Sequence, residues 1–259
     1  METGAITGYI DVAQVTLYVF WVFFAGLIFY LRREDKREGY PLEADGGSGR
    51  IRVQGFPAFP GLKVFRGRDG HTYTAPNYKA DRRTVAAAPV GPWPGAPLQP
   101  TGNPMLDGVG PASWADREDK PELTFEGVPS IVPLRLLPAT IIEPNDPDPR
   151  GMPVIAGDGK IAAVVKDVWV DRAEALIRYL EVEVPGAPEG RRVLVPLTMA
   201  RVNATRGAVT VQSIFARHFA DVPATASLDQ VTKLEEDRIV AYFAGGTLYA
   251  SPQRMGPLL

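Results

Sequence analysis

An uninterrupted run of uncharged residues near the amino terminus constrains this chain more than any other feature. From Val12 to Leu31 twenty consecutive residues carry no charge. At about 1.5 Å per residue a helix of this length reaches roughly 30 Å, the thickness of the hydrocarbon core of a bilayer. We therefore expect a transmembrane helix rather than a buried core helix. A signal peptide fits less well, because the acids Glu2 and Asp11 precede the run and no small-residue cleavage site follows it.

The charges that flank this run predict its orientation. Four basic residues follow it and none precedes it; they are Arg32, Arg33, Lys36 and Arg37. The positive-inside rule then places residues 1–11 in the periplasm and the long carboxyl-terminal part in the cytoplasm. The mixed charges after the run either meet anionic headgroups or serve only as a stop-transfer flank, and charge alone does not separate these two interpretations.

The overall composition excludes several classes of protein. The 259 residues carry 28 basic and 30 acidic side chains, so the net charge of −2 offers no basic excess for binding nucleic acid. The chain has no cysteine, which excludes disulfides, thiolate metal sites and cysteine nucleophiles. Glycine and proline number 26 and 25, which predicts many turns and few long helices beyond the first.

The segment 32–153 is rich in proline and glycine and shows few sustained apolar periods. It is either a disordered linker or an extended segment that becomes ordered against a partner protein. Aromatic residues spaced along it favour the second alternative, because linkers usually lack such anchors. We also expect short strands at Arg50–Gln54 and Gly70–Ala75. The aromatic residues are Phe56, Phe59, Phe65, Tyr73, Tyr78, Trp93 and Trp114.

The pattern changes to β structure in the last segment, 154–259. Short stretches rich in β-branched residues, separated by turn residues, predict a small antiparallel barrel. In the stretch RYLEVEV we expect Tyr179, Glu181 and Glu183 on a wet face and the alternate residues on a dry face. A helix is expected over Leu234–Phe243, ended by Gly245–Gly246. The expected strands are Lys160–Val170, Ile177–Val184, Arg191–Leu197 and Ala208–Val211.

No motif in the sequence supports catalysis by this chain alone. A phosphate loop, a dinucleotide fingerprint, a nucleophile elbow and a zinc-binding histidine pair are all absent from the sequence. The two histidines, His71 and His218, lie far apart, and lone histidines are usually surface or internally bonded residues. A membrane-anchored hydrolase is therefore disfavoured, and we expect no catalytic, metal-binding or cofactor-binding residues.

Two groups of charged residues carry alternative interpretations. Asp171 and Glu174 have the spacing of a helix N-cap residue and its N3 partner, but carboxylates beside a buried acceptor can also pass protons. Arg178 lies four residues after Glu174 and could pair with it. The run Asp116–Glu122 reads most simply as a solvated surface, and it is also a place where protons could be gathered.

Several stretches resemble the H subunit of the photosynthetic reaction centre of purple bacteria. Their order and the predicted topology agree with that family over nearly the whole chain. The stretches are YLRREDKREGYPLE (Tyr30–Glu43), PTGNPMLDGVGPASW (Pro100–Trp114), DPDPRGMPV (Asp146–Val154), DVWVDRAEALIRYLEVEV (Asp167–Val184) and LEEDRIVAYFAGGTLYA (Leu234–Ala250).

This resemblance implies one transmembrane helix and a mainly β cytoplasmic domain of the PRC-barrel type with a carboxyl-terminal helix. It implies a noncatalytic subunit in the intracytoplasmic photosynthetic membrane that covers the L and M subunits, shields their quinone sites and relays protons to the secondary quinone. Bacteriochlorophyll, bacteriopheophytin, quinones and a non-haem iron are expected in the partner subunits. A tetrahaem cytochrome subunit, an antenna complex and membrane lipids are further expected partners.

The resemblance also assigns roles to individual residues. Glu174 matches the family's glutamate nearest the secondary quinone, with Asp171 close to it, and Glu122 matches an acid near the point of proton uptake. Where the best-known family members carry an Asp and two His, this chain has TFEGV, so Glu126 is the one carboxylate there and a surface metal site is doubtful. The resemblance then implies that proton entry rests on Glu126, Glu122 or other acids. The residues expected at the lipid headgroups are Tyr30, Lys36, Arg37 and Tyr40.

A second function stays open from the sequence. A PRC-barrel module tethered to a membrane could hold a protein partner unrelated to photosynthesis. The absorption spectrum of the gently solubilised native assembly separates the two, because only a reaction centre carries pigment.

Overall fold

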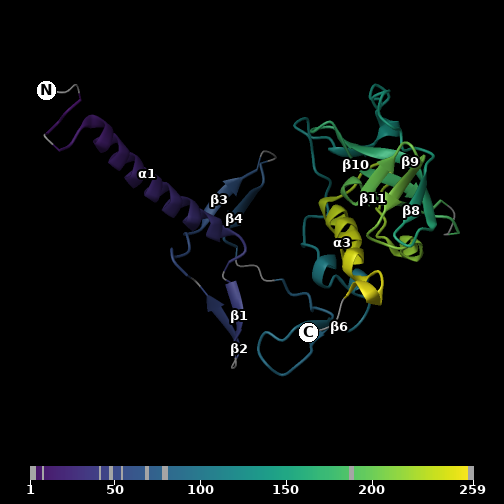
Figure 1. Cartoon of the computed structure of the whole chain (residues 1–259), viewed down its shortest axis with the longest axis horizontal. Helices are drawn as coiled ribbons and strands as arrows, with labels where there is room; N and C mark the ends of the chain where they lie inside the picture. The colour runs from purple at the N-terminus through teal and green to yellow at the C-terminus, as the bar shows by residue number, and fades with distance from the viewer. Residues whose placement is uncertain are drawn as a thin grey trace. The chain divides into compact units, whose positions relative to one another are not determined.

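The computed structural model describes residues 4–7, 9–40, 42–46, 49–53, 55–67, 70–77, 81–186 and 190–255. Contacts within the chain divide it into two compact units. Unit 1 comprises Met1–Arg82 and Gly91–Pro97, and unit 2 comprises Arg83–Val90 and Leu98–Leu259. Figure 1 shows the long helix α1 in unit 1 and the main sheet with helix α3 in unit 2. Of the residues singled out above, Glu2, Gln54 and Tyr78 lie outside the described residues.

Helix α1 (Val12–Glu34) occupies the uncharged run and continues into a 3-10 turn, η1 (Asp35–Arg37). Asp11 begins the helix, since its carboxylate accepts the N–H of Gln14 at 2.7 Å. No side chain of α1 is buried within the chain, so apolar surface extends all round the helix. A helix of this kind suits a lipid environment, and α1 is long and apolar enough to cross a membrane. The predicted helix is therefore confirmed.

Unit 1 also contains two small hairpins. Strand β1 (Leu42–Gly46) pairs with β2 (Gly49–Val53), and β3 (Lys63–Arg66) pairs with β4 (Thr72–Ala75), both antiparallel. The strand predicted at Gly70–Ala75 corresponds to β4, and the strand predicted from Arg50 corresponds to β2. In the second hairpin the rings of Phe65 and Tyr73 stack with centroids 5.1 Å apart.

Unit 2 is built on a seven-stranded half-barrel. The strand order is β11-β10-β9-β8-β13-β12. Strand β7 pairs with the carboxyl-terminal end of β9. All pairs are antiparallel except β8 with β13. The strands are β7 (Ile131–Pro133), β8 (Pro153–Ala156), β9 (Ile161–Asp171), β10 (Leu176–Glu183), β11 (Arg192–Pro196), β12 (Ala200–Asn203) and β13 (Ala208–Val211). The four strands expected from the sequence are β9, β10, β11 and β13, so the predicted β fold is confirmed.

Short elements complete unit 2. A small hairpin joins β5 (Ala87–Pro89) to β6 (Leu98–Pro100), and helix α2 (Pro104–Asp107) leads to the turn η2 (Gly110–Ala112). Met105 and Ala112 from these elements are buried, as are Ile131 and Leu134. The linker alternative is therefore wrong for this part of the chain. Further 3-10 turns are η3 (Leu134–Leu136), η4 (Leu197–Met199), η5 (Ala216–Asp221) and η6 (Pro252–Arg254).

The half-barrel buries side chains on both faces of its central strands. Val168, Leu180 and Val182 on one face are fully buried. On the other face, Tyr179 and Glu181 are only 4% and 1% exposed, so the expectation of a wet face there is wrong. The reason is that η3 and the segment 228–229 cover this face, and Arg135 joins them to it.

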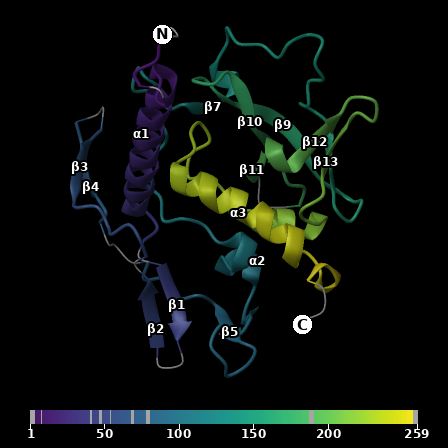
Figure 2. The ribbon, with the colours of Figure 1, turned by 60° about the vertical axis from the view of Figure 1, so that its left-hand side comes forward.

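Helix α3 (Lys233–Tyr249) packs against the half-barrel near β11, as the views in Figures 1 and 2 show. Thr232 and Glu235 form a capping box at its start. The predicted helix is confirmed, but the expectation that Gly245–Gly246 would end it is wrong, since both glycines lie inside it. They permit close packing: a Cβ at Gly245 would lie 2.6 Å from the Cβ of Ala112, and one at Gly246 would lie 2.6 Å from the carbonyl oxygen of Ser213.

Candidate functional site

The turn between β9 and β10 carries the acids that the sequence singled out. Asp171 ends β9, and its Oδ1 accepts hydrogen bonds from Ser130 Oγ at 2.7 Å and from the N–H of Ala173 and Glu174 at 2.9 and 3.3 Å. The side chain of Glu174 is 59% exposed. The capping-box interpretation is wrong, because the four residues between the strands form a hairpin turn and no helix. Asp171 still binds backbone N–H groups, but it does so within this turn.

Asp171 is buried yet ionised. Burial raises its pKa, but the hydrogen bonds from Ser130 and from two backbone N–H groups, with the charge of Arg178, outweigh burial and hold the pKa below its ordinary value. Arg178 lies 3.9 Å from Asp171 and 4.0 Å from Glu174, so the predicted pairing with Glu174 is present at long range. Asp171 therefore acts as a fixed negative charge within the turn that carries the exposed Glu174.

A half-buried glutamate that the sequence analysis did not single out lies near this turn. Glu236, in the first turn of α3, accepts a hydrogen bond of 2.7 Å from the phenol of Tyr179 on β10. Burial raises the pKa of Glu236, the charge of Glu122 raises it further, and Tyr179 and Arg178 only partly oppose this rise. The pKa of Glu236 is therefore raised above its ordinary value, whereas that of Asp171 is lowered.

The spacing of apolar residues in this helix could have shown that Glu236 faces inward. Glu235, beside it in the first turn of α3, closes the capping box with Thr232. Glu236, however, lies three residues before Ile239 and seven before Phe243, and both are fully buried. This spacing places its carboxylate on the inward face of α3.

The charge run of residues 115–120 crosses the start of α3, and we call it the strap. The N–H of Ala115 donates to Asp237 at 3.1 Å, Glu118 pairs with Lys233 at 3.0 Å, and Asp119 accepts from Thr232 at 2.7 Å. Pro121 forms a β-bridge with Thr232. The strap is exposed, as the surface interpretation expected, but these contacts fix its course along α3.

An aromatic clamp holds the amino-terminal end of the strap. The guanidinium groups of Arg83 and Arg238 both lie over the ring of Trp114, at 4.0 and 4.4 Å from its centroid. Arg83 also donates to the carbonyl of Trp114 at 2.8 Å. These two cation–π contacts with one indole stabilise this arrangement.

The strap leads to the remaining acids predicted from the sequence. The carbonyl of Glu122 accepts the N–H of Ser130 at 2.7 Å, and Ser130 is the residue that binds Asp171. Glu126 is at the tip of the exposed loop between Glu122 and Ser130, which a β-bridge between Leu123 and Pro129 closes. The fold thus brings Glu122, Asp171, Glu174 and Arg178 into one region together with Glu236. Glu126 lines a cavity of about 390 Å³ together with Arg172 and Ala173 of the β9–β10 turn. The role of the predicted acids and of Arg178 in proton transfer stays a prediction.

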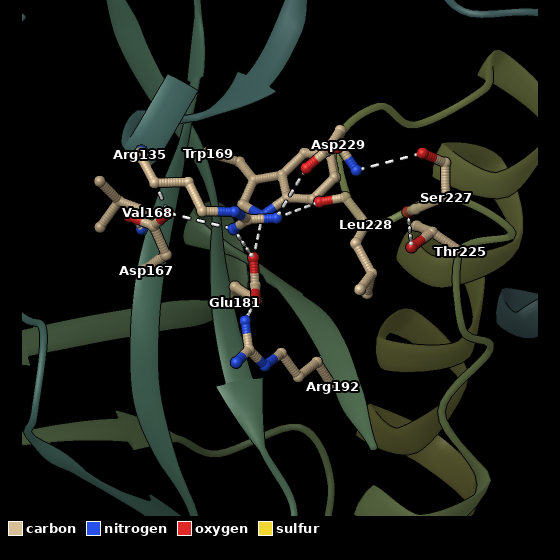
Figure 3. Close-up of polar contacts among 10 residues, drawn as sticks. All are labelled: Arg135, Asp167, Val168, Trp169, Glu181, Arg192, Thr225, Ser227, Leu228 and Asp229. Atoms are coloured by element: carbon tan, nitrogen blue, oxygen red, sulfur yellow. Dashed lines mark hydrogen bonds and ion pairs between the residues drawn. The ribbon is translucent and has the colours of Figure 1, made fainter. Parts of the chain in front are cut away.

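A second charged cluster, shown in Figure 3, lies on the face of β9 and β10 that η3 covers. Glu181 accepts from Arg135 and Arg192 at 2.7 Å each and from the indole N–H of Trp169 at 2.8 Å. Arg135 also pairs with Asp167 at 3.2 Å, and it reaches Asp229 at 3.1 Å on the segment that precedes α3. Burial raises the pKa of Glu181, but these three donors outweigh burial and hold the pKa below its ordinary value. This cluster is a structural hub of fixed charges.

Within the described residues no group of three or more His, Cys, Asp and Glu side chains is arranged to hold a metal ion. The Nδ1 atom of His218 accepts the N–H of Phe215 at 3.1 Å, so this histidine is internally bonded as expected.

Two family models match the chain. One describes the amino-terminal region of the H chain of the photosynthetic reaction centre, and it matches residues 4–136, more than half of the chain. This chain belongs to the reaction-centre H-chain family. The second model describes the PRC-barrel domain and matches residues 144–217, which contain most of the half-barrel strands. Both matches confirm the resemblance and the fold predicted from the sequence.

Membership in the H-chain family has direct consequences. The chain is a subunit of the reaction centre, of a kind that is generally noncatalytic, and it associates with the L and M subunits. One helix able to span the bilayer fits a single-pass membrane protein of this family.

The residues of this H chain that were expected at lipid headgroups are in unit 1. Lys36 is only 1% exposed and donates to the carbonyl of Pro57, with its ammonium over the rings of Tyr40 and Phe59. Arg37 pairs with Glu34 at 2.9 Å and donates to the carbonyls of Gly61 and Ala75; Tyr30 is exposed. The two basic groups therefore bind within unit 1, and a lipid contact by these four residues stays a prediction.

Proposed function

We propose that this chain caps the cytoplasmic face of the L and M subunits, shields their quinone sites from bulk water, and relays protons to the secondary quinone. The β9–β10 turn is the observation that supports the relay best. It holds an exposed carboxylate, Glu174, whose backbone N–H donates to the buried carboxylate of Asp171, and Ser130 joins this turn to Glu122. Family membership supports the association with the L and M subunits, and this series of acids supports a route for protons.

The route that we propose begins at the exposed acids Glu126 and Glu122. Glu236 holds a proton in its half-buried position, because burial raises its pKa toward the solution pH, where proton exchange is most effective. Asp171 and Arg178 supply fixed charges of opposite sign. Glu174, exposed at the turn, passes the proton to the partner subunits.

In this proposal the light-driven chemistry belongs to groups bound by L and M. The secondary quinone supplies the acceptor, which takes up two electrons and two protons. Bacteriochlorophyll, bacteriopheophytin, the quinones and a non-haem iron are assigned to the partner subunits. A close-packed half-barrel supports the shielding role, because a dry lid keeps bulk water from the acceptor while a few carboxylates admit protons.

We also propose the location and further partners. The basic residues after α1 support an orientation with residues 1–11 in the periplasm and the carboxyl-terminal part in the cytoplasm, in the intracytoplasmic photosynthetic membrane. An antenna complex, a tetrahaem cytochrome subunit and membrane lipids complete this proposed assembly. Tyr30 and Tyr40 remain the proposed headgroup contacts, with Lys36 and Arg37 holding the adjacent chain.

The test is Glu174→Gln in the purified complex. This change removes the titratable group but keeps the size of the side chain, so we expect a slower proton-coupled second electron transfer to the secondary quinone. Glu183→Gln is the matched control, because Glu183 is at the other end of β10 and pairs with Lys166 on the surface. Unchanged kinetics of the Glu174 variant across pH would exclude a relay through this residue.

A further inference from the structure

A proline-rich loop of unit 1 packs against the end of the spanning helix. The ring of Phe56 lies 5.8 Å from the ring of Phe29 on α1, measured between centroids. Phe29 belongs to the uncharged run and lies two residues before its end at Leu31. The contact therefore places the ring of Phe56 at the depth of the last turn of the membrane-spanning segment, near the boundary between acyl chains and headgroups.

Two cationic side chains at the helix end hold this loop, which we define as Gly55–Gly61. Lys36 donates to the carbonyl of Pro57, and Arg37 donates to the carbonyl of Gly61 at 2.7 Å. The loop is thus tied to the end of α1 near both of its ends. Gly55 begins the loop with a φ of +61°, a conformation that favours glycine.

Apart from its contact with Phe29, the side chain of Phe56 faces outward. It is 84% exposed, and its neighbour Phe29 is 46% exposed. The other aromatic ring of the loop, Phe59, instead faces inward over Lys36. The ring of Phe59 therefore holds the loop in place, and the ring of Phe56 faces outward beside the apolar surface of α1.

The charges around this ring match a lipid surface. Arg32 and Arg33 are exposed at the end of α1, one turn beyond Phe29, where phosphate groups begin. Arg32 donates to the phenol of Tyr40 at 3.1 Å, which keeps an amphipathic ring at the same level. An apolar ring at the acyl boundary with guanidinium groups beside it is the pattern of an interfacial membrane anchor.

We propose that the loop Gly55–Gly61 is an interfacial anchor and that Phe56 inserts into the lipid leaflet that contains the carboxyl-terminal end of α1. The occupant of this surface is lipid, because the ring continues the apolar exterior of α1 at the depth of the acyl chains, and the exposed guanidinium groups of Arg32 and Arg33 suit lipid phosphates. The anchor fixes the depth and rotation of α1. It is independent of the proposed proton relay.

The absence of cysteine from the chain permits a direct test. Phe56→Cys carries a nitroxide label in the intact reaction-centre complex, reconstituted into vesicles of phosphatidylcholine and phosphatidylglycerol. Spin-relaxation measurements then compare collisions with oxygen, which concentrates in lipid, and with a neutral nickel chelate, which stays in water. Because Phe56 is exposed, the substitution removes no core packing.

Two labelled controls calibrate the measurement. Phe23→Cys, on the exposed surface of α1, reports the hydrocarbon, and Ile161→Cys, exposed at the start of β9 in unit 2, reports water. We expect the label at Phe56 to collide severalfold more often with oxygen than with the chelate, as at Phe23. Behaviour like that of Ile161 would overturn the proposal. Weak collisions with both reagents would also overturn it, because they would show that a partner subunit covers the ring.

Discussion

The phenol of Tyr179 donates a hydrogen bond of 2.7 Å to the carboxylate of Glu236, and this contact joins β10 to the first turn of α3. From the sequence, we expected Tyr179 on the solvent-exposed face of its strand, and Glu236 only as part of the start of a helix. The structure instead places them at a half-buried position, where burial raises the pKa of Glu236 above its ordinary value.

This raised pKa predicts how stability depends on pH. The folded chain binds the Glu236 proton more tightly than the unfolded chain, so this stabilisation is fully present below the unfolded pKa and is lost as pH rises through the folded pKa. Glu236→Gln cannot ionise, and we expect the variant to gain stability relative to the native chain as pH rises. Urea unfolding of the solubilised chain at several pH values measures this difference. Parallel pH profiles would contradict the assignment.

The charge hub predicts a large loss of stability. Glu181→Gln leaves Arg135 and Arg192 without their buried counter-charge, and breaking a buried pair costs about 3–5 kcal/mol. We expect the lower end, about 3 kcal/mol, because the side chains of Arg135 and Arg192 are 33% and 37% exposed and can regain water. Urea unfolding measures the effect. For Glu183→Gln, a surface change on the same strand, we expect a loss below about 1 kcal/mol; equal losses in both variants would show that the hub adds nothing.

The pH dependence of the hub has the opposite sign from that of Glu236. Hydrogen bonds hold the pKa of Glu181 below its ordinary value, so its stabilisation is present above the unfolded pKa and is lost as pH falls through the folded pKa. We expect the native chain to lose its advantage over Glu181→Gln in acid. Stability curves that stay equally far apart down to low pH would contradict this expectation.

Close packing of α3 predicts that alanine is harmful at Gly246, although alanine is the better helix former. The added Cβ would lie 2.3 Å from Cγ2 of Ile214 and 2.6 Å from the carbonyl oxygen of Ser213. Helix propensity favours alanine by about 1 kcal/mol, but forcing atoms into a packed core costs about 1–3 kcal/mol. We expect a lower melting temperature for Gly246→Ala and no loss for Thr247→Ala on the exposed side of α3. A stabilised Gly246 variant would refute this view of the packing.

The clamp around Trp114 predicts local order in the strap. Trp114→Leu removes two cation–π contacts, each worth about 0.5–1 kcal/mol at an exposed site. We expect amide hydrogen exchange in residues 115–120 to accelerate about tenfold, since 1.4 kcal/mol corresponds to a factor of ten. The control is Trp93→Leu in unit 1, which should leave the strap unchanged. Unchanged exchange in the Trp114 variant would show that the ionic contacts alone hold the strap.

Local sequence patterns predicted those parts of the fold that depend on local chemistry. The uncharged run gave α1, the β-branched stretches gave β9, β10, β11 and β13, and the apolar period gave α3. Strand β7 was missed because it is only three residues long and follows a proline-rich segment. The end of α3 was misplaced because Gly245 and Gly246 serve packing with distant residues, which a local pattern does not contain.

In the candidate site, too, the sequence predicted what neighbouring residues determine and missed what contacts between distant residues determine. Asp171, Glu174 and Arg178 were found because they are close together in the sequence. The burial of Glu181 was missed because the alternation along β10 shows which residues share a face but not that η3 covers that face. Glu236 was missed because its role depends on Tyr179, 57 residues earlier in the chain.

The most direct test is flash-induced proton uptake by an L–M core that has been stripped of this chain and rebuilt. One preparation receives the native chain, and another receives a chain with Gln in place of four glutamates, Glu122, Glu126, Glu174 and Glu236. General acid–base groups contribute factors of about 100 or more, so we predict that uptake coupled to the second electron transfer slows about 100-fold with the variant. Equal uptake rates in the two preparations would contradict the claim that carboxylates of this chain carry protons to the secondary quinone.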